Sequence, residues 1–156
     1  MSLTIDRASL LVRVPGAVTI AQLEETLAAE DLTLGIDVAD PTMSIAEWIA
    51  KGAPGAPSPF DDPADHLLAG LSATLHGGQH LEIRPGPRRA VGPDLVALVF
   101  GAAERFATLD RAWLRVRPRG KATPQSTVTT KLLVDSPVSH EEAALLDAIA
   151  RELRQL

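Results

Sequence analysis

Two histidines and a carboxylate gather around one predicted turn of the chain. His76 and His80 flank the Gly77-Gly78 pair, and Glu82 follows two residues after the second histidine. Zinc binds such nitrogen and oxygen ligands at about 2 Å, and Glu82 could be a third ligand if all three side chains share one face. Two solvated histidines at the tip of a hairpin explain the same residues without a metal. The sequence therefore predicts no metal site.

The chain offers few residues for nucleophilic or acid–base catalysis. It has no cysteine and no G-x-S-x-G motif, and no base is predicted beside Ser72. Asp61, Asp62 and Asp65 cluster with His66, but acidic residues at the start of a helix stabilise that helix without any reaction. We therefore predict no catalytic residue in this chain.

Glycine-rich loops that could cradle a phosphate are the remaining candidates. The sequence contains neither G-x-G-x-x-G nor a Walker loop. Gly52 to Gly55, and Gly86 to Gly92 around Arg88-Arg89, could still let backbone N–H groups approach an anion. Loops that simply connect regular elements are the preferred interpretation of these glycines.

The elements that must position these residues alternate between strand and helix patterns. Strands are predicted over 9–14, 71–76, 80–84, 108–117 and 127–134. Helices are predicted to begin at Thr19, Ser44, Pro93 and Ser139, and the third of them should run to Phe106. The last helix should bury Leu146, Ile149, Leu153 and Leu156. Mixed helices and strands with hairpins are typical of the α+β class, so we expect an antiparallel sheet flanked by helices.

Length and charge exclude several classes of protein. The chain has 156 residues, which is room for one compact domain. Its 15 Lys and Arg against 20 Asp and Glu give a net charge of -5, which argues against a nucleic-acid-binding protein. No apolar run approaches about 18 residues, and the first residues lack the pattern of a secretory signal. We therefore expect no membrane span and a cytoplasmic protein.

Five segments follow, in order, the motifs of one known family. The stretch from Val14-Pro15-Gly16 is similar to V-x-P-G-x-T-x-x-x-L-x-x-x-L, and residues 44–50 are similar to T-I-G-G-W-L-A. Residues 68–77 are similar to V-L-G-L-x-A-V-L-x-D-G, residues 92–101 to G-x-D-L-x-x-L-x-x-G, and residues 105–116 to R-F-G-I-L-T-R-A-T-L-R-V. They resemble the flavin-binding domain of the type-4 FAD-linked oxidases, the fold of vanillyl-alcohol oxidase, p-cresol methylhydroxylase and alkyl-dihydroxyacetonephosphate synthase. The FAD subunits of glycolate oxidase are the nearest in this resemblance.

The resemblance implies that the chain is the second half of that flavin domain. Residues 1–118 correspond to the second flavin subdomain, 119–126 to a linker, and 127–156 to one strand and one helix of the cap domain. The first subdomain, with its glycine-rich pyrophosphate loop, would precede residue 8. By position, the resemblance implies that FAD, if it binds, contacts Ser44, Ile45, Gly52, Asp94 and Gly101.

Glycines that the family keeps beside the cofactor are replaced here. The pair in T-I-G-G falls at Ala46 and Glu47, and two glycines of G-x-x-G-R-F-G fall at Glu104 and Ala107. A side chain crowds a close backbone approach and makes a positive φ costly, and a carboxylate repels a pyrophosphate. Glu47 is also the expected capping-box partner of Ser44.

Two functions from different classes follow. The favoured one is a degenerate, non-catalytic flavin-domain homologue that acts as an interaction or partner subunit. It would cover the apolar face left by the missing half through homodimerisation or by binding a flavoprotein partner. The alternative is an FAD-binding subunit of a 2-hydroxy-acid oxidoreductase, similar to glycolate oxidase, whose pyrophosphate-binding half comes from another chain. The two differ in whether the isolated chain binds FAD.

Overall fold

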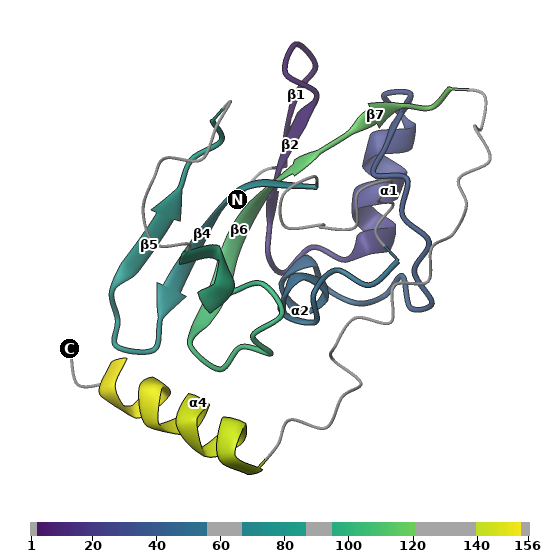
Figure 1. Cartoon of the computed structure of the whole chain (residues 1–156). Coiled ribbons are helices and arrows are strands. Elements are labelled where there is room, and N and C mark those ends of the chain that lie inside the picture. The colour runs from purple at the N-terminus through teal and green to yellow at the C-terminus, as the bar shows by residue number, and fades with distance from the viewer. Residues whose placement is uncertain (1–2, 56–66, 87–94, 121–139, 154–156) are drawn as a thin grey trace.

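The computed structural model describes residues 3–55, 67–86, 95–120 and 140–153 (Figure 1). Its elements in chain order are β1 Thr4–Asp6, β2 Leu11–Pro15, α1 Ile20–Ala28, β3 Leu32–Thr33, α2 Ile45–Ala50, β4 Leu68–Leu75, β5 His80–Ile83, the 3-10 helix η1 Leu95–Leu98, β6 Ala107–Arg115, β7 Arg117–Pro118 and α4 His140–Leu153. The predicted strand over 127–134 and the start of the last helix at Ser139 lie outside the described residues.

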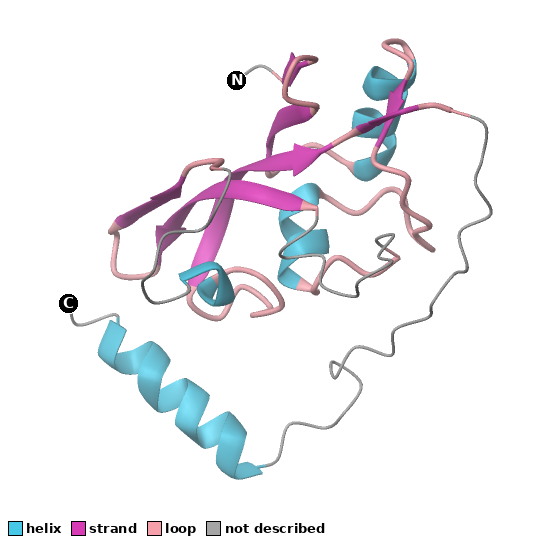
Figure 2. Cartoon of the chain, turned by 45° about the horizontal axis from the view of Figure 1, so that its top comes forward, coloured by secondary structure: helices cyan, strands magenta, loops and turns pink. Residues whose placement is uncertain are grey.

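A five-stranded antiparallel sheet in the order β1-β2-β6-β4-β5 forms the centre of the fold (Figure 2). β3 and β7 pair separately as a small two-stranded sheet. The predicted α+β class, with hairpins and flanking helices, is confirmed. Among the described helices, none combines the length and the apolar content needed to span a bilayer.

One face of the large sheet packs on α1 and α2. The alternation of side chains in β6 shows which residues lie on this face. Ala112 and Leu114 are fully buried, and so are Val12 and Val14 on the paired β2. These residues join the apolar sides of α1 and α2 in a single core cluster, in which Trp48 is completely buried. The polar residues between them lie on the opposite face, which we call the outer face of the sheet.

Thr19 begins α1 as the sequence predicted. Its Oγ1 accepts a hydrogen bond from the N–H of Gln22 at 3.2 Å, and the Gln22 side chain accepts from the N–H of Thr19 at 3.1 Å. Both bonds of a capping box are therefore present. The β4–β5 hairpin is also confirmed, although only Gly78 in its turn has a positive φ, of 88°.

The predicted helix from Pro93 to Phe106 is wrong. Of its described residues, 95–106, only Leu95–Leu98 is helical, as a 3-10 turn, and the residues that follow form irregular turns. Gly101, Ala103 and Glu104 have φ of 68°, 49° and 58°, and left-handed residues end a right-handed helix. The apolar spacing that suggested a helix reflects burial of Val96 and Val99 from a compact turn.

Two further differences concern the ends of the chain. No strand was predicted at Thr4–Asp6, yet β1 pairs with β2 because the Asp6 carboxylate accepts from the N–H groups of Ala8 and Ser9 and closes the connecting turn. In α4, Ile149 was expected to be buried but is 42% exposed. The side chains of Leu146, Leu153 and Leu156 lie outside the described residues.

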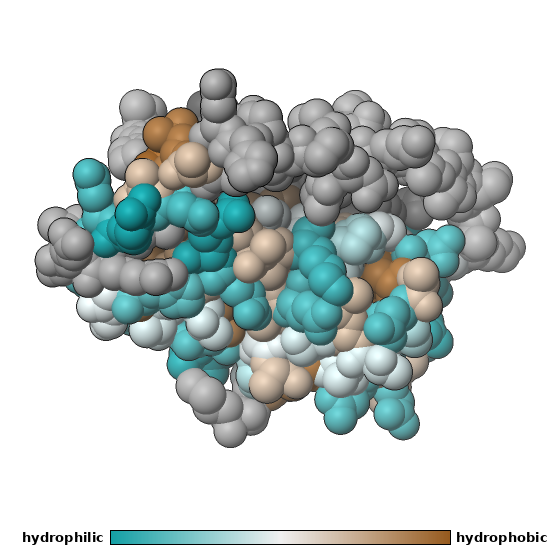
Figure 3. All heavy atoms as spheres, turned by 90° about the horizontal axis from the view of Figure 1, so that it is seen from below, coloured by the Kyte–Doolittle hydropathy of each residue, from teal (hydrophilic) through white to brown (hydrophobic). Residues whose placement is uncertain are grey.

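The expected large apolar face is not found in the described part of the chain. The large hydrophobic residues exposed there are Leu10, Leu95, Leu145 and Ile149. In the view of Figure 3, apolar residues form small separate patches among polar ones. A partner-binding surface in the described part of the chain must therefore involve polar or charged side chains as well as apolar ones.

Candidate functional site

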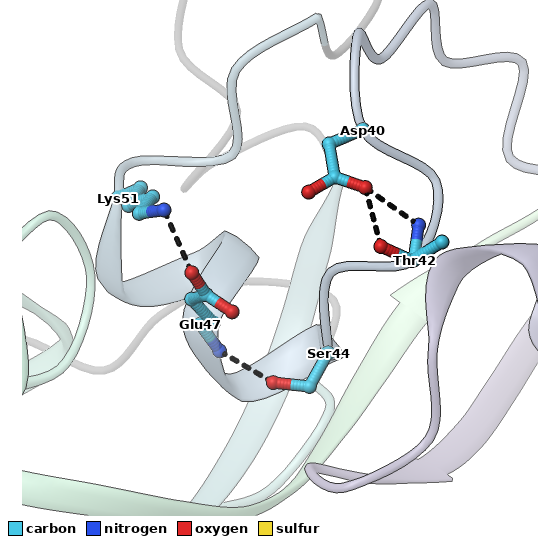
Figure 4. A network of polar contacts seen from close by, with 5 residues as sticks. All are labelled: Asp40, Thr42, Ser44, Glu47 and Lys51. Atoms are coloured by element: carbon cyan, nitrogen blue, oxygen red, sulfur yellow. Dashed lines mark hydrogen bonds and ion pairs between the residues drawn. The ribbon is translucent and has the colours of Figure 1, made fainter.

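Ser44 is the N-cap of α2, and it lies at the first position that the resemblance assigns to a cofactor. Its Oγ accepts a hydrogen bond from the N–H of Glu47 at 3.1 Å (Figure 4). The Glu47 carboxylate does not return to Ser44 but pairs with Lys51 Nζ at 2.7 Å. The predicted capping box is therefore only half formed, because Lys51, four residues later, attracts the carboxylate more directly.

The loop before Ser44 is braced by Asp40 and Thr42. The Thr42 hydroxyl and N–H donate to Asp40 Oδ1 at 2.6 and 3.0 Å (Figure 4). The hydroxyl contact first, then the N–H contact, hold the pKa of the Asp40 carboxyl below its ordinary value, and the nearby Lys51 charge adds to this. These bonds stabilise the charged carboxylate, which in turn holds the loop that precedes α2.

The other N–H groups in the first turn of α2 are paired within the protein. Ile45 donates to the carbonyl of Val18 at 2.8 Å, and Ala46 donates to the carbonyl of Gly16 at 2.9 Å. A helix N-terminus binds an anion through N–H groups that have no other partner. With the Glu47 N–H bonded to Ser44, residues 45–47 offer none, and the Ile45 side chain is fully buried.

Gly16 permits this closure by letting two backbones approach. A Cβ on Gly16 would lie 2.4 Å from the carbonyl oxygen of Leu109 and 3.2 Å from Ala46 Cβ. The Gly16 N–H also donates to the carbonyl of Asp110 at 2.8 Å. Packing between β2, α2 and β6 therefore accounts for the Pro-Gly motif.

Gly52 and Gly101 meet at the other end of α2. Their φ values are 81° and 68°, and a Cβ on Gly101 would lie 3.9 Å from Gly52 Cα. The N–H of Gly101 donates to the carbonyl of Ile49 at 3.0 Å, and that of Ala103 donates to the carbonyl of Ala50 at 2.9 Å. The loop after η1 thus satisfies carbonyls that the end of a helix leaves unpaired.

The structure therefore places four of the five predicted contact residues at the two ends of one short helix. Ser44 and Ile45 lie at its start, and Gly52 and Gly101 lie together just beyond its end. Asp94 lies outside the described residues. Gly101 is exposed, whereas Gly52 is buried.

The four replaced glycines have different fates in the structure. Ala46 and Glu47 are helical and Ala107 begins β6, so these three positions now have conformations that suit any residue. Glu104 instead keeps a left-handed φ of 58°, which costs a non-glycine residue about 1 kcal/mol or more. His76 Nε2 lies 2.8 Å from the Glu104 carbonyl oxygen and helps to hold this turn.

A Ser–His–Asp arrangement lies on the outer face of β4, β5 and β6. Ser72 Oγ lies 3.4 Å from His80 Nε2, and His80 Nδ1 lies 3.7 Å from Asp110 Oδ2. The expectation that no base lies beside Ser72 is therefore wrong, because antiparallel pairing brings the start of β5 alongside β4. Ser72 is only 2% exposed, so its hydroxyl is closed to a substrate, although the His80 side chain is exposed. Thr74 Oγ1 donates to the same Asp110 oxygen at 3.0 Å, so these residues form a polar network that links β4, β5 and β6.

The two histidines around the hairpin have separate partners. His76 contacts the Glu104 carbonyl, and His80 contacts Ser72 and Asp110. Glu82, the candidate third ligand, instead accepts from Arg84 Nε at 2.9 Å. Within the described residues, no three His, Asp or Glu side chains are grouped so that they could hold a metal ion.

Comparisons with known proteins place the fold. No protein-family model matches the chain, and no curated protein sequence matches it. Two solved structures, of alkyldihydroxyacetonephosphate synthase in crystal forms P212121 and P1, superpose on it with a TM-score of 0.64 and 19% sequence identity. The chain has the fold of one part of this synthase.

The match covers 76% of this chain but only 21% and 22% of the two synthase chains. The chain therefore spans about a fifth of the length of the protein that it resembles. The synthase is among the proteins whose flavin-binding fold the sequence motifs resemble, so motifs and backbone agree on the fold. The nearer resemblance to glycolate oxidase subunits, and the boundaries at 118 and 126, stay predictions.

Proposed function

We propose that this chain is a non-catalytic module with the fold of a flavin-binding subdomain, which binds no FAD by itself and acts as an interaction or partner subunit. The observation that carries the proposal is the closed first turn of α2. Its N–H groups at 45, 46 and 47 donate to Val18, Gly16 and Ser44. A pyrophosphate there would find no free donor and would meet the Glu47 carboxylate.

FAD therefore does not fit the residues present at the start of α2, and we derive no reaction through it. The proposed role requires only that the chain folds stably without FAD. The buried core around Trp48, the cap at Ser44 and the close approach at Gly16 supply that packing without a ligand.

The test is a titration of the purified full chain with FAD, followed by flavin absorbance and by the thermal unfolding midpoint. A ligand at about 100 times its Kd would stabilise the chain by about 2.7 kcal/mol, which such a scan detects. We expect a colourless protein and no shift in the midpoint. Flavin that co-purifies, or a clear shift with FAD alone, would overturn the proposal.

A double variant with Glu47→Gly and Glu104→Gly tests whether FAD binding is prevented by the lost glycines or by the paired N–H groups of α2. It restores the glycines of the resembled motifs, whereas Glu25→Gly on the exposed side of α1 is the control for an added glycine. We expect neither to bind FAD, because the N–H groups of Ile45 and Ala46 remain paired. Binding by the double variant alone would show that the lost glycines are the limiting defect.

One observation supports the second candidate, an FAD-binding subunit completed by another chain. Gly101 is exposed, and the turn through Ala103 and Glu104 keeps left-handed φ angles. Such an accessible turn could form one wall of a site shared with a pyrophosphate-binding partner of the 2-hydroxy-acid oxidoreductase type. FAD binding that requires a partner chain co-purified from the native cells would favour this candidate over the first.

A further inference from the structure

Three arginines surround Trp113 on the outer face of the sheet. Arg13 in β2 pairs directly with Trp113 in β6, so the two side chains lie on the same face. Arg111 and Arg115 lie two residues before and after Trp113 and therefore share that face. Arg13 and Arg115 are exposed, and Trp113 and Arg111 are half-buried. We call these four residues the arginine–tryptophan patch.

The patch carries three positive charges that the described part of the chain leaves without an ion pair. Carboxylates that flank it on the sheet have other partners: Asp6 accepts from its own turn, Glu82 pairs with Arg84, and Asp110 accepts from Thr74. This is unexpected in a chain with net charge -5. Tryptophan and arginine are also the residues most enriched at the centres of protein interfaces.

α4 has a face of the opposite character. Leu145, Ala148 and Ile149 follow one another at helical spacing, and Leu145 and Ile149 are 62% and 42% exposed. Glu142 lies one turn before this apolar stretch, and the exposed Glu152 lies one turn after it. The helix therefore combines an apolar centre with acidic ends.

α4 has little to hold it on its own chain within the described residues. The ion pair between Asp147 and Arg105, with 3.6 Å between oxygen and nitrogen, links it to the loop before β6. Both cartoon views place α4 beyond the β4–β5 turn, away from the arginine–tryptophan patch (Figures 1 and 2). Its apolar face is thus available to another molecule.

We propose that α4 of a second copy of this chain docks on the arginine–tryptophan patch. The apolar stretch of α4 would cover Trp113. The acidic positions one turn before and after this stretch, 142 and 152, would bring negative charge to Arg111 and Arg115 at the two ends of the patch. The spacing fits: ten steps along a helix span about 15 Å, and the four steps from Arg111 to Arg115 span about 13 Å of strand. This inference deepens the proposed function and rests on it, because it names the surface of the interaction subunit.

Two-fold symmetry makes the contact reciprocal. If α4 of the first copy covers the patch of the second, then α4 of the second covers the patch of the first. A dimer therefore contains two identical contacts, and one substitution in the chain alters both. The same reciprocity allows a charge-swap experiment.

The experiment measures the dimer Kd of the full chain by sedimentation equilibrium. One variant carries Arg111→Glu and Arg115→Glu, and a second carries Glu142→Arg and Glu152→Arg. Like charges then face each other in both contacts, and we expect each variant alone to dimerise about 100-fold or more weakly than the wild type. Lys51→Glu, on α2, is the control and should leave the Kd unchanged.

Mixing the two variants decides the proposal. In the mixed dimer the reversed patch of one variant meets the reversed helix of the other, and the native patch meets the native helix. Opposite charges then face each other in both contacts, so the heterodimer should regain wild-type affinity while each variant alone stays monomeric. A monomeric wild type, unchanged affinity in the variants, or a mixture that stays monomeric would each overturn the proposal. Circular dichroism of each variant checks that it is folded before its Kd is used.

The FAD titration is independent of these measurements. FAD binding by the wild-type chain would overturn the proposed function and would leave the Kd comparison valid. A colourless monomer would overturn the docking of α4 and would leave the closed first turn of α2 as described.

Discussion

The two tryptophans of this chain lie in opposite surroundings. Trp48 in α2 is completely buried, and its Nε1 donates to the carbonyl of Pro54 at 2.9 Å. Trp113 in β6 is half-buried on the outer face, with Arg13, Arg111 and Arg115 as neighbours. The region around α2 satisfies its polar groups internally, whereas the outer face leaves charges without partners in the described part of the chain.

This difference distinguishes the region that resembles a cofactor site from the outer face, where charged side chains have no ion pair in the described part of the chain. The ends of α2 match the flavin-contact positions by sequence, but their N–H and carbonyl groups already bond to the protein. The arginine–tryptophan patch includes Arg111 and Arg115 of the segment similar to R-A-T-L-R-V. The resemblance assigns no cofactor contact to the patch, yet the patch holds the groups that interfaces use. Where donors and charges remain unpaired is therefore a better guide to binding here than where motifs align.

Replacing each tryptophan by alanine should have the largest effect and should test the difference between the two regions most directly. Trp48→Ala removes a fully buried ring and should lower the free energy of unfolding by about 3 to 5 kcal/mol. Trp113→Ala removes a half-exposed ring and should lower it by only about 1 to 2 kcal/mol. Urea unfolding, measured at a concentration where the chain is monomeric, compares them.

The same pair should show the reverse order in self-association. Trp113→Ala should weaken the dimer more than any stability loss explains, and a folded Trp48 variant should keep its affinity. Equal costs in stability, or equal dimer affinities, would contradict the distinction between the two regions.

Removing the cap of α2 should have a smaller effect. Ser44→Ala deletes the oxygen that accepts from the Glu47 N–H at 3.1 Å and should cost about 1 kcal/mol of unfolding free energy. Thr19→Ala removes one bond of the complete capping box of α1 and serves as the matched comparison, with a similar cost. Chemical denaturation of both variants measures the difference. A Ser44→Ala chain as stable as the wild type would show that the first turn of α2 is less closed than its hydrogen bonds indicate.

The smallest effect should be the pH dependence from Asp40. Its pKa is lowered in the folded chain by the Thr42 hydroxyl and N–H, so the bound carboxylate stabilises the fold above the unfolded pKa of about 3.8. That stabilisation is lost as the pH falls through the lower folded pKa.

Asp40→Asn should therefore be less stable than the wild type at about pH 7, and the difference should shrink as the pH falls below about 3.8. The urea midpoint against pH measures it, and Glu25→Gln controls for the loss of one negative charge. A difference that grows toward acid would have the wrong sign for this cause.

Local signals in the sequence predicted much of the fold. Thr19 with Gln22 marked the start of α1, and alternation over 108–117 marked β6 and its buried side. The helix from Pro93 failed because apolar spacing does not show left-handed residues such as Ala103 and Glu104. β1 was missed because three residues carry too short a pattern.

The sequence likewise predicted only part of the candidate site. Motif positions put Ser44 and Gly101 on one site, and the fold does bring them to one helix. Spacing could not show that the N–H groups of Ile45 and Ala46 were already bonded, since their partners lie near Gly16, far along the chain. The Ser72–His80–Asp110 network was missed for the same reason, because strand register sets it.

The sequence by itself determined the class of the fold, the caps of the first helices and the excess of acidic charge, because each depends on composition or on residues within one turn of each other. The tertiary structure decided which polar groups are satisfied and which charges have no ion pair among the described residues. Pairing of β2 with β6 gathers Arg13, Trp113 and Arg115 from positions about 100 residues apart, and packing of Gly16 on Leu109 closes α2. Both depend on strand register and close approach, which no local pattern contains.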